Sequence, residues 1–316
     1  MKEYYPAHQD NLFLLKRYPE DISMKLQGAF TALVTPFKNG VLDEEAYREF
    51  IEWQITEGID GLVPCGTTGE SATLSHEEHE KVIRICVEQA KGRVPVIAGA
   101  GSNNTAEAID LAKASKAAGA DAILLITPYY NKPTQEGLMA HFKAVAQAVP
   151  MPTVVYNVPG RTGVNVLPAT MARLYKEIPE IIGVKEATAD LTQVSAILEN
   201  VNDDDFILLS GDDFTILPTL SIGGKGVISV ISNVAPKATA KLCSAYFSGD
   251  LAMAKKLHYE LNPLCRACFV ETNPVPAKTA VALMGKMTDE LRLPLVNLQP
   301  ASLDALKKVL IHMALI

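Results

Sequence analysis

Eight short apolar runs rich in β-branched residues recur along this chain of 316 residues, and segments with helical periodicity separate them. The runs are AFTALVTPF, GLVPCG, VPVIAG, DAILLIT, TVVYNV, IIGVKE, FILLSG and GVISVI. They are almost continuously apolar rather than alternating, which is typical of parallel strands buried on both faces. About eight strand–helix units predict an α/β fold, the (β/α)8 TIM barrel, which takes roughly 250 residues.

The segments between the runs carry helix start and stop signals. In SHEEHEKVIRICVEQAKG, Ser75 and Glu78 predict a capping box and Gly92 predicts the end of the helix. Asp43 and Gly58 predict the same two features for DEEAYREFIEWQITEG. The alternative is a doubly wound open sheet, which usually has fewer parallel strands and often carries G-x-G-x-x-G after the first one. Here TPFKNG follows the first run.

The apolar strand runs stop after GVISVI, and the pattern from about residue 236 onward is helical with proline-rich breaks. We therefore expect a catalytic barrel over residues 26–235. Residues 236–316 are expected to supply the last barrel helix and an appended helical segment. Residues 1–25 precede the first strand run as an N-terminal extension.

Charge and hydropathy exclude several classes of function. The net charge is -7 and there is no long basic run, so nothing indicates nucleic-acid binding. The apolar runs are shorter than the ~20 residues needed to span a bilayer, so no membrane association is expected. The first residues, MKEYYPAHQDNLFLLKRYPEDIS, have only LFLL as an apolar core and contain scattered acids, unlike a signal peptide. We expect a cytoplasmic protein.

Five cysteines are present, and an odd number in a long chain argues against a disulfide framework. Cys265 and Cys268 form a single C-x-x-C, but a zinc site normally needs a second pair of ligands at suitable spacing. This segment has helical periodicity, in which the spacing places both residues on one face. Buried thiols are therefore favoured over a redox or metal site.

Polar groups follow the ends of several predicted strands, in CGTTGES, TPYYN, YNVPGRTG, VKEAT and SGDD. Each has a structural alternative. GTTGE is either a tight turn or an anion-binding nest before a helix, although it lacks the lysine of a P-loop. The aspartates of SGDD are candidate metal ligands without an acidic cluster around them. Tyr156 alone is equally compatible with a core aromatic, and Lys185 with a surface lysine.

The barrel changes this assessment because its chemistry lies at the C-terminal ends of the strands. A lysine, tyrosines and threonine hydroxyls then share one mouth, without histidine or a metal cluster. Lys185 ends the apolar run IIGV, and burial penalises a charged ammonium relative to the neutral amine. A neutral amine attacks carbonyls and forms a Schiff base. The pattern therefore favours amine catalysis at Lys185.

Eight motifs together resemble the dihydrodipicolinate synthase family of the class I pyruvate aldolases, from about Gln27 to the C-terminus. They are GTTGESATLSHEEH, IAGAGSNNTAEAI, TPYYNKPTQEGL, YNVPGRTG, GVKEAT, LSGDD, GVISV and NPVPAK. The resemblance implies condensation of pyruvate with L-aspartate 4-semialdehyde to 4-hydroxy-tetrahydrodipicolinate, in lysine and diaminopimelate biosynthesis. It implies a covalent imine with pyruvate and neither cofactor nor metal.

The resemblance also implies roles for individual residues. Lys185 would form the imine, and Tyr156 would be the acid and base beside it. Thr67 would link Tyr156 to Tyr130 in a proton relay, with Tyr130 supplied by a neighbouring subunit of a homotetramer built as a dimer of dimers.

On the substrate side, the resemblance implies that Thr68 and the backbones of Gly211 and Ile228 line the pyruvate pocket. Arg161 would hold the carboxylate of aspartate semialdehyde, as suits a bidentate guanidinium.

An effector site for L-lysine at a dimer interface is implied as well. The matching residues are Ser71, Ala72, His76, His79, Asn103, Glu107 and Tyr129. Glu107 would pair with the α-amino group of the effector. The alternative for the two histidines is a solvent-facing helix N-terminus. Their spacing of three differs from that of the H-E-x-x-H zinc helix.

Three other functions compete. N-acetylneuraminate lyase shares the lysine and the tyrosine, but typically has serine at the position of Thr67 and an apolar residue at that of Arg161. Another pyruvate-dependent 2-keto-acid aldolase is a further alternative. A non-catalytic binding barrel predicts loss of Lys185 or Tyr156, and both are present.

Overall fold

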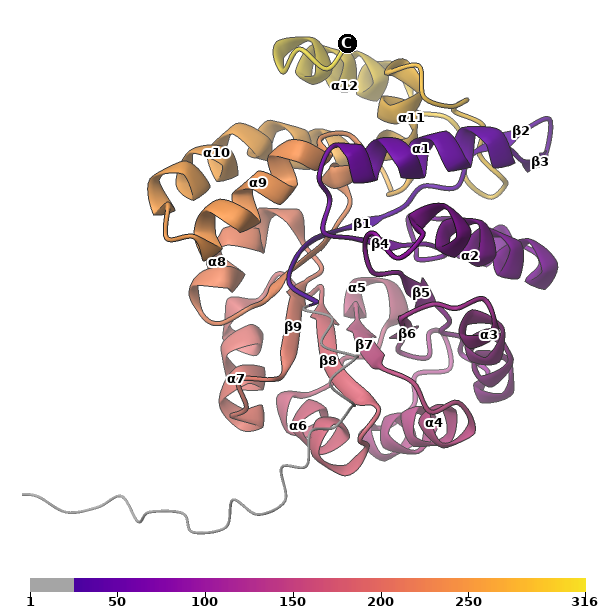
Figure 1. Cartoon of the computed structure of the whole chain (residues 1–316), viewed down its shortest axis with the longest axis vertical. Coiled ribbons are helices and arrows are strands. Elements are labelled where there is room, and N and C mark those ends of the chain that lie inside the picture. Colours follow the sequence, from indigo (N-terminus) through magenta and orange to yellow (C-terminus); the bar gives the residue numbers. More distant parts are fainter. Residues whose placement is uncertain (1–25) are drawn as a thin grey trace, which may run out of the picture.

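The structure is a computed structural model that describes residues 26–316, and the predicted N-terminal extension lies outside the described residues. Eight parallel strands lie in the order β4-β1-β10-β9-β8-β7-β6-β5 (Figure 1). A bridge between Leu62 and Val96 joins the two end strands and closes the barrel. The strands are β1 (Gly28–Ala32), β4 (Gly61–Val63), β5 (Ile97–Gly99), β6 (Ala122–Ile126), β7 (Thr153–Asn157), β8 (Ile181–Glu186), β9 (Ile207–Ser210) and β10 (Gly226–Ser229). The predicted TIM barrel is confirmed, since each expected run contains one barrel strand.

Helices surround the strands and continue beyond the barrel at the C-terminus (Figure 1). The helices that follow successive strands are α1 (Glu44–Thr56), α2 (His76–Ala90), α3 (Thr105–Ala117), α4 (Gln135–Ala148), α5 (Pro159–Thr162), α6 (Pro168–Glu177), α7 (Leu191–Val201), α8 (Ile216–Ser221) and α9 (Pro236–Phe247). The chain then forms α10 (Leu251–Cys268), α11 (Val275–Leu283) and α12 (Pro300–His312). A two-stranded hairpin, β2 (Phe37–Lys38) with β3 (Val41–Leu42), lies between β1 and α1. The division of the chain into three parts stays a prediction.

The sequence signals at helix ends are found as expected. Ser75 and Glu78 form the capping box of α2, and the side chain of Asp43 accepts a hydrogen bond from Ala46 N at the start of α1. Helix α2 ends at Ala90. Lys91 then adopts the left-handed conformation, and the expected stop residue Gly92 follows it. Local chemistry thus fixes where these helices start and stop.

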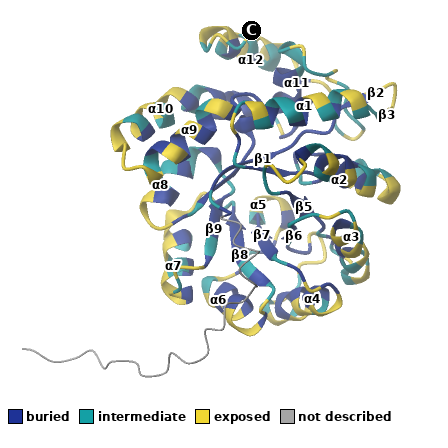
Figure 2. Ribbon diagram, in the orientation of Figure 1, coloured by how far each residue is buried: buried dark blue, intermediate teal, exposed yellow. Residues whose placement is uncertain are grey.

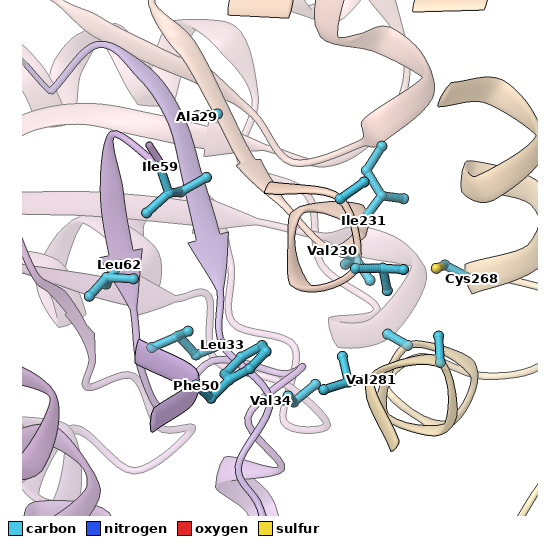
Figure 3. Close-up of a cluster of buried hydrophobic side chains, with 14 of the residues drawn as sticks. Ala29, Leu33, Val34, Phe50, Ile59, Leu62, Val230, Ile231, Cys268 and Val281 are labelled. Carbon is cyan, nitrogen blue, oxygen red and sulfur yellow. The ribbon is translucent and has the colours of Figure 1, made fainter. Parts of the chain in front are cut away.

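The C-terminal helices are fused to the barrel by apolar packing. Exposed residues lie on the outer helix faces, whereas the strands and inner faces are buried (Figure 2). Val281 of α11 and Cys268 of α10 belong to the same buried cluster as Val34 and Ile231 at the ends of the barrel strands β1 and β10 (Figure 3). Because this cluster is continuous, the segment after α10 is held against the barrel mouth.

All five cysteines are buried and unbridged, and burial raises the pKa of the Cys265 and Cys268 thiols. Both lie in α10, so the C-x-x-C spacing is one buried helix face, as expected. Among residues 26–316, no helix is long and apolar enough to cross a membrane.

Candidate active site

Lys185 and Tyr156 lie side by side at the C-terminal ends of neighbouring strands. They are paired in register between β8 and β7, and each side chain is only 6% exposed. The Lys185 Nζ lies 4.2 Å from the centroid of the Tyr156 ring. It has no carboxylate or hydrogen-bond partner within the described part of the chain. The low exposure excludes the surface-lysine alternative and leaves an amine held against an aromatic face.

The GTTGE loop after β4 is a tight turn closed by its own backbone hydrogen bonds. Gly69 N and Ser71 N donate to Gly66 O, and Glu70 N donates to Thr67 O. The N–H groups of Gly66, Thr67 and Thr68 make no hydrogen bond within the described residues, so this tight turn still offers amide donors to an anion. The turn presents Thr67 to the cavity and buries Thr68 to 2% exposure.

The GTTGE loop is also held in place by residues of the C-terminal segment. Glu70 adopts the left-handed conformation, and its Oε1 lies 2.6 Å from Lys278 Nζ of α11, both side chains being fully buried. Arg292 N donates to the other Glu70 oxygen at 3.2 Å. An ion pair between the mouth and the C-terminal segment therefore fixes the turn that carries Thr67 and Thr68.

A cavity of about 450 Å³ opens at this end of the barrel. Three of the expected catalytic and substrate-binding residues line it: Thr67, Tyr156 and Arg161. Six of the seven expected effector residues line it as well: Ser71, Ala72, His76, His79, Glu107 and Tyr129. Residues of both expected sites thus line one cavity within a single chain, although Lys185 and Asn103 are not among its wall residues.

Arg161 and Thr68 are both held by one residue that the sequence did not identify. Arg161 Nη2 donates to the backbone oxygen of Asn273 at 3.1 Å. The Asn273 Nδ2 donates to Thr68 Oγ1 at 3.0 Å. Asn273 lies in NPVPAK, where the prolines suggested only a break between helices. That motif was the one available signal.

The two remaining expected pocket residues lie at the ends of β9 and β10. Gly211 N donates to Glu186 O at 2.7 Å, and a Cβ at Gly211 would come within 2.5 Å of the Ala187 Cβ. The close approach of the two chain segments requires glycine there. Ile228 is a buried residue of β10. Neither residue lines the cavity, but both lie at the mouth end of their strands.

Tyr130 of TPYYN is exposed in the single chain, whereas its neighbour Tyr129 is partly exposed on the cavity wall. Tyr130 is 89% exposed and has a φ of 71°, and Tyr129 is 38% exposed. Asn103 Nδ2 donates to Tyr129 O at 3.0 Å, and Asn131 Nδ2 donates to Asn103 O at 2.8 Å, so the loop is tied to the loop after β5. Within the described chain, no hydrogen bond joins the hydroxyls of Tyr130, Tyr156 and Thr67.

Glu107 lies in a polar cluster with His76 and Ser102. His76 Nε2 lies 2.8 Å from one carboxylate oxygen, and the Ser102 hydroxyl donates to the other. These contacts lower the pKa of Glu107, with the Ser102 bond as the largest cause. His76 faces solvent, but His79 is buried, and burial lowers its pKa to about 4. The solvent-facing alternative therefore holds for one histidine only, and Ser102 is a further residue that the sequence did not identify.

The side chains of both aspartates in SGDD accept hydrogen bonds from backbone N–H groups. The side chain of Asp212 caps a short helical turn at Thr215, and buried Asp213 accepts from Val230 N and Ile231 N. Burial raises the pKa of Asp213 to about 6. Across residues 26–316, no three His, Cys, Asp or Glu side chains gather as metal ligands.

Fold and site together define the class: a (β/α)8-barrel enzyme whose buried lysine and tyrosine meet at the C-terminal mouth. The chain belongs to the dihydrodipicolinate synthetase family, whose model matches residues 25–313, and it is a lyase.

Individual members of this family are similar to this chain over nearly their whole length. The chain is 64% identical to the 4-hydroxy-tetrahydrodipicolinate synthase of Nitratidesulfovibrio vulgaris (strain DSM 19637 / Miyazaki F), over 91% of this chain and 98% of that protein. It superposes on the chloride-inhibited dihydrodipicolinate synthase of Acinetobacter baumannii complexed with pyruvate, with a TM-score of 0.89, 44% identity, and coverage of 92% and 99%. It also superposes on the dihydrodipicolinate synthase of Cyanidioschyzon merolae with lysine bound, with a TM-score of 0.89 and 39% identity, over 92% of this chain and 99% of that chain.

Proposed function

We propose that this chain condenses pyruvate with L-aspartate 4-semialdehyde to 4-hydroxy-tetrahydrodipicolinate, a step of lysine and diaminopimelate biosynthesis in the cytoplasm. The Lys185 amine adds to the keto carbon of pyruvate, and loss of one water leaves an imine. Loss of a methyl proton then gives an enamine, which forms a carbon–carbon bond to the aldehyde. Attack of the second substrate's amino group on the imine carbon closes the ring and releases Lys185. No external cofactor is required.

The observation that carries this proposal is the placement of Lys185 against Tyr156. The amine is buried, lies 4.2 Å from the ring centroid and has no acid partner in the described residues. A structural lysine at this depth is normally paired, as Lys278 is with Glu70. Tyr156 is the register partner of Lys185 on the neighbouring strand, and its hydroxyl suits the proton transfers of imine formation.

Arg161 supports aspartate semialdehyde as the second substrate. It lies on the cavity wall, and within residues 26–316 its side chain makes one hydrogen bond, from Nη2 to the Asn273 carbonyl. The remaining N–H groups suit a carboxylate. N-acetylneuraminate lyase remains the second candidate because it needs the same lysine and tyrosine, but a sugar chain calls for hydroxyl partners rather than a cation at this place.

A coupled assay with pyruvate and aspartate semialdehyde tests the proposal. We expect condensation that depends on both substrates, and little cleavage of N-acetylneuraminate. Efficient cleavage of that sugar acid, with weak use of aspartate semialdehyde, would favour the lyase instead.

The high exposure of Tyr130 supports its role in a neighbouring subunit. In the single chain its side chain is exposed and makes no hydrogen bond to Tyr156 or Thr67 within residues 26–316, and its φ is positive, which is uncommon for a residue other than glycine. We propose a homotetramer, a dimer of dimers, in which Tyr130 reaches the partner's Thr67 and Tyr156.

The cluster around Glu107 is proposed to bind L-lysine as a feedback inhibitor. Glu107 supplies the negative charge that an α-ammonium group needs, His76 contacts it, and Asn103, which donates to the Tyr129 oxygen, is a further polar partner. The shared cavity offers a direct route by which a bound effector alters the wall next to Tyr156. The relative from Cyanidioschyzon merolae with lysine bound supports this assignment.

A further inference from the structure

Asn273 bridges the two halves of the mouth. It comes from the segment between α10 and α11, yet its side chain contacts Thr68 on the loop after β4, 205 positions earlier in the chain. Its backbone oxygen contacts Arg161 in the turn after β7. The side chain is 5% exposed and the residue lies on the cavity wall.

The direction of the hydrogen bond to Thr68 carries the argument. The Nδ2 of Asn273 donates and the Thr68 oxygen accepts, at 3.0 Å. Thr68 donates its own proton to no group in residues 26–316. A hydroxyl that accepts from a fixed amide keeps its proton available for another acceptor. The Oδ1 of Asn273 accepts no hydrogen bond from the described residues, so the amide serves Thr68 through its donor alone.

We infer that Asn273 is a positioning residue: it orients the Thr68 hydroxyl as a donor toward the carboxylate of the keto-acid substrate. Its backbone oxygen meanwhile orients Arg161 for the second substrate. This inference rests on the proposed function, because that function places the keto acid next to Thr68. The two contacts use different parts of Asn273, so substitution of the side chain removes the first and spares the second.

Changes at Asn273 separate this role from simple packing. Asn273→Ala removes the donor and leaves the Thr68 hydroxyl unoriented. Asn273→Asp keeps the shape but replaces the donor with an acceptor, so Thr68 must turn its proton away from the substrate, and the added negative charge opposes an anionic keto acid. A packing role predicts that the isosteric Asp variant is the milder one. The inferred role predicts the reverse order.

Pyruvate alone is a sufficient probe. Borohydride trapping across a pyruvate series, followed by intact-mass measurement, gives the half-saturating concentration for imine formation without the aldehyde. We expect an increase of about 5- to 30-fold for Asn273→Ala, which is typical of losing one buried hydrogen bond. A larger increase is expected for Asn273→Asp. Val270→Ala, three positions earlier, is the control: Val270 is 43% exposed and does not line the cavity, so the half-saturation of this variant should stay within twofold of wild type.

A second readout locates the effect. Asn273→Ala combined with Thr68→Val should be no worse than Thr68→Val alone, because both remove the same bond. The losses in kcat/KM from Asn273→Ala and Arg161→Ala should multiply, since the backbone contact to Arg161 survives.

Three results would overturn the inference: an Asp variant milder than the Ala variant, multiplying effects with Thr68→Val, or a raised KM for the aldehyde in Asn273→Ala. If the Ala variant does not fold, the isosteric Asp variant decides alone, and a half-saturation within threefold of wild type contradicts the role. Failure of the wild type to trap pyruvate would instead refute the proposed function.

Discussion

The buried pair Glu70–Lys278 is expected to be indispensable for the barrel mouth. Both side chains have no exposed area, and their charged atoms lie 2.6 Å apart. Lys278→Met removes the charge and leaves an unbranched side chain that is one atom shorter. Within residues 26–316, the Glu70 carboxylate then retains one hydrogen-bond donor, the Arg292 N–H at 3.2 Å. An unpaired buried carboxylate avoids the desolvation penalty of its charge by taking up a proton. The free energy of protonation at neutral pH therefore sets an upper limit on the loss in the free energy of unfolding.

The magnitude follows from the ordinary carboxyl pKa of ~4.3. Protonating such a group at pH 7 costs roughly 2.7 pH units times 1.36 kcal/mol, or ~3.7 kcal/mol. This agrees with the ~3–5 kcal/mol measured when one partner of a buried pair is removed. With an unfolding entropy of ~2.1 cal/mol/K per residue, the Tm should fall by about 5–6 °C.

Thermal and urea unfolding of the Lys278→Met variant test this value. Because the loss is the cost of a proton, it should shrink by ~1.4 kcal/mol for each unit of pH lowered between pH 7 and 5. The matched control is Lys286→Met, which removes a half-buried lysine stacked 3.9 Å from the Trp53 ring centroid and should cost ~1 kcal/mol or less. Glu70→Gln in the Lys278→Met background should restore most of the loss. A loss below 1 kcal/mol, or one independent of pH, would refute this reasoning.

Three further outcomes concern function. Arg161→Ala should lower kcat/KM for aspartate semialdehyde by about 10–150-fold, since a charge-assisted pair contributes ~1.5–3 kcal/mol, while half-saturation of imine trapping by pyruvate stays near wild type; unchanged kcat/KM contradicts its role. Tyr130→Phe and Lys185→Ala should each be nearly inactive alone, and activity should return when subunits exchange, because a hybrid dimer contains one complete site; verified hybrids without activity would place Tyr130 in its own chain's site. Glu107→Ala should remove inhibition by L-lysine, measured against the same variant without lysine, and binding of millimolar lysine by calorimetry should vanish with it; inhibition that persists in Glu107→Ala would place the effector elsewhere.

The sequence predicts the parts of the mouth that depend on strand order and local pattern. Lys185 and Tyr156 could be placed together because parallel strands end at the same face of a barrel, and their register pairing agrees. The helix caps at Ser75 and Asp43 were predictable because they involve residues within three positions.

Contacts that span the chain could not be predicted in this way. Asn273 meets Thr68 across 205 positions and Lys278 meets Glu70 across 208, and no periodicity links residues so far apart. Their pairing depends on how the C-terminal helices dock through the apolar cluster shown in Figure 3, which only the three-dimensional structure reveals. The orientation of Tyr130 also depends on the fold of one loop rather than on its residue type.

Formation of an imine between Lys185 and pyruvate is tested most directly by borohydride trapping followed by peptide mapping. Reduction of the pyruvate imine should add a stable lactyl group to one lysine, and the modified peptide should contain Lys185. Lys185→Met should abolish the adduct while its Tm stays close to that of wild type, because the amine has no ion-pair partner within residues 26–316. An intact-mass spectrum without an adduct, or an adduct mapped to another lysine, would contradict the account.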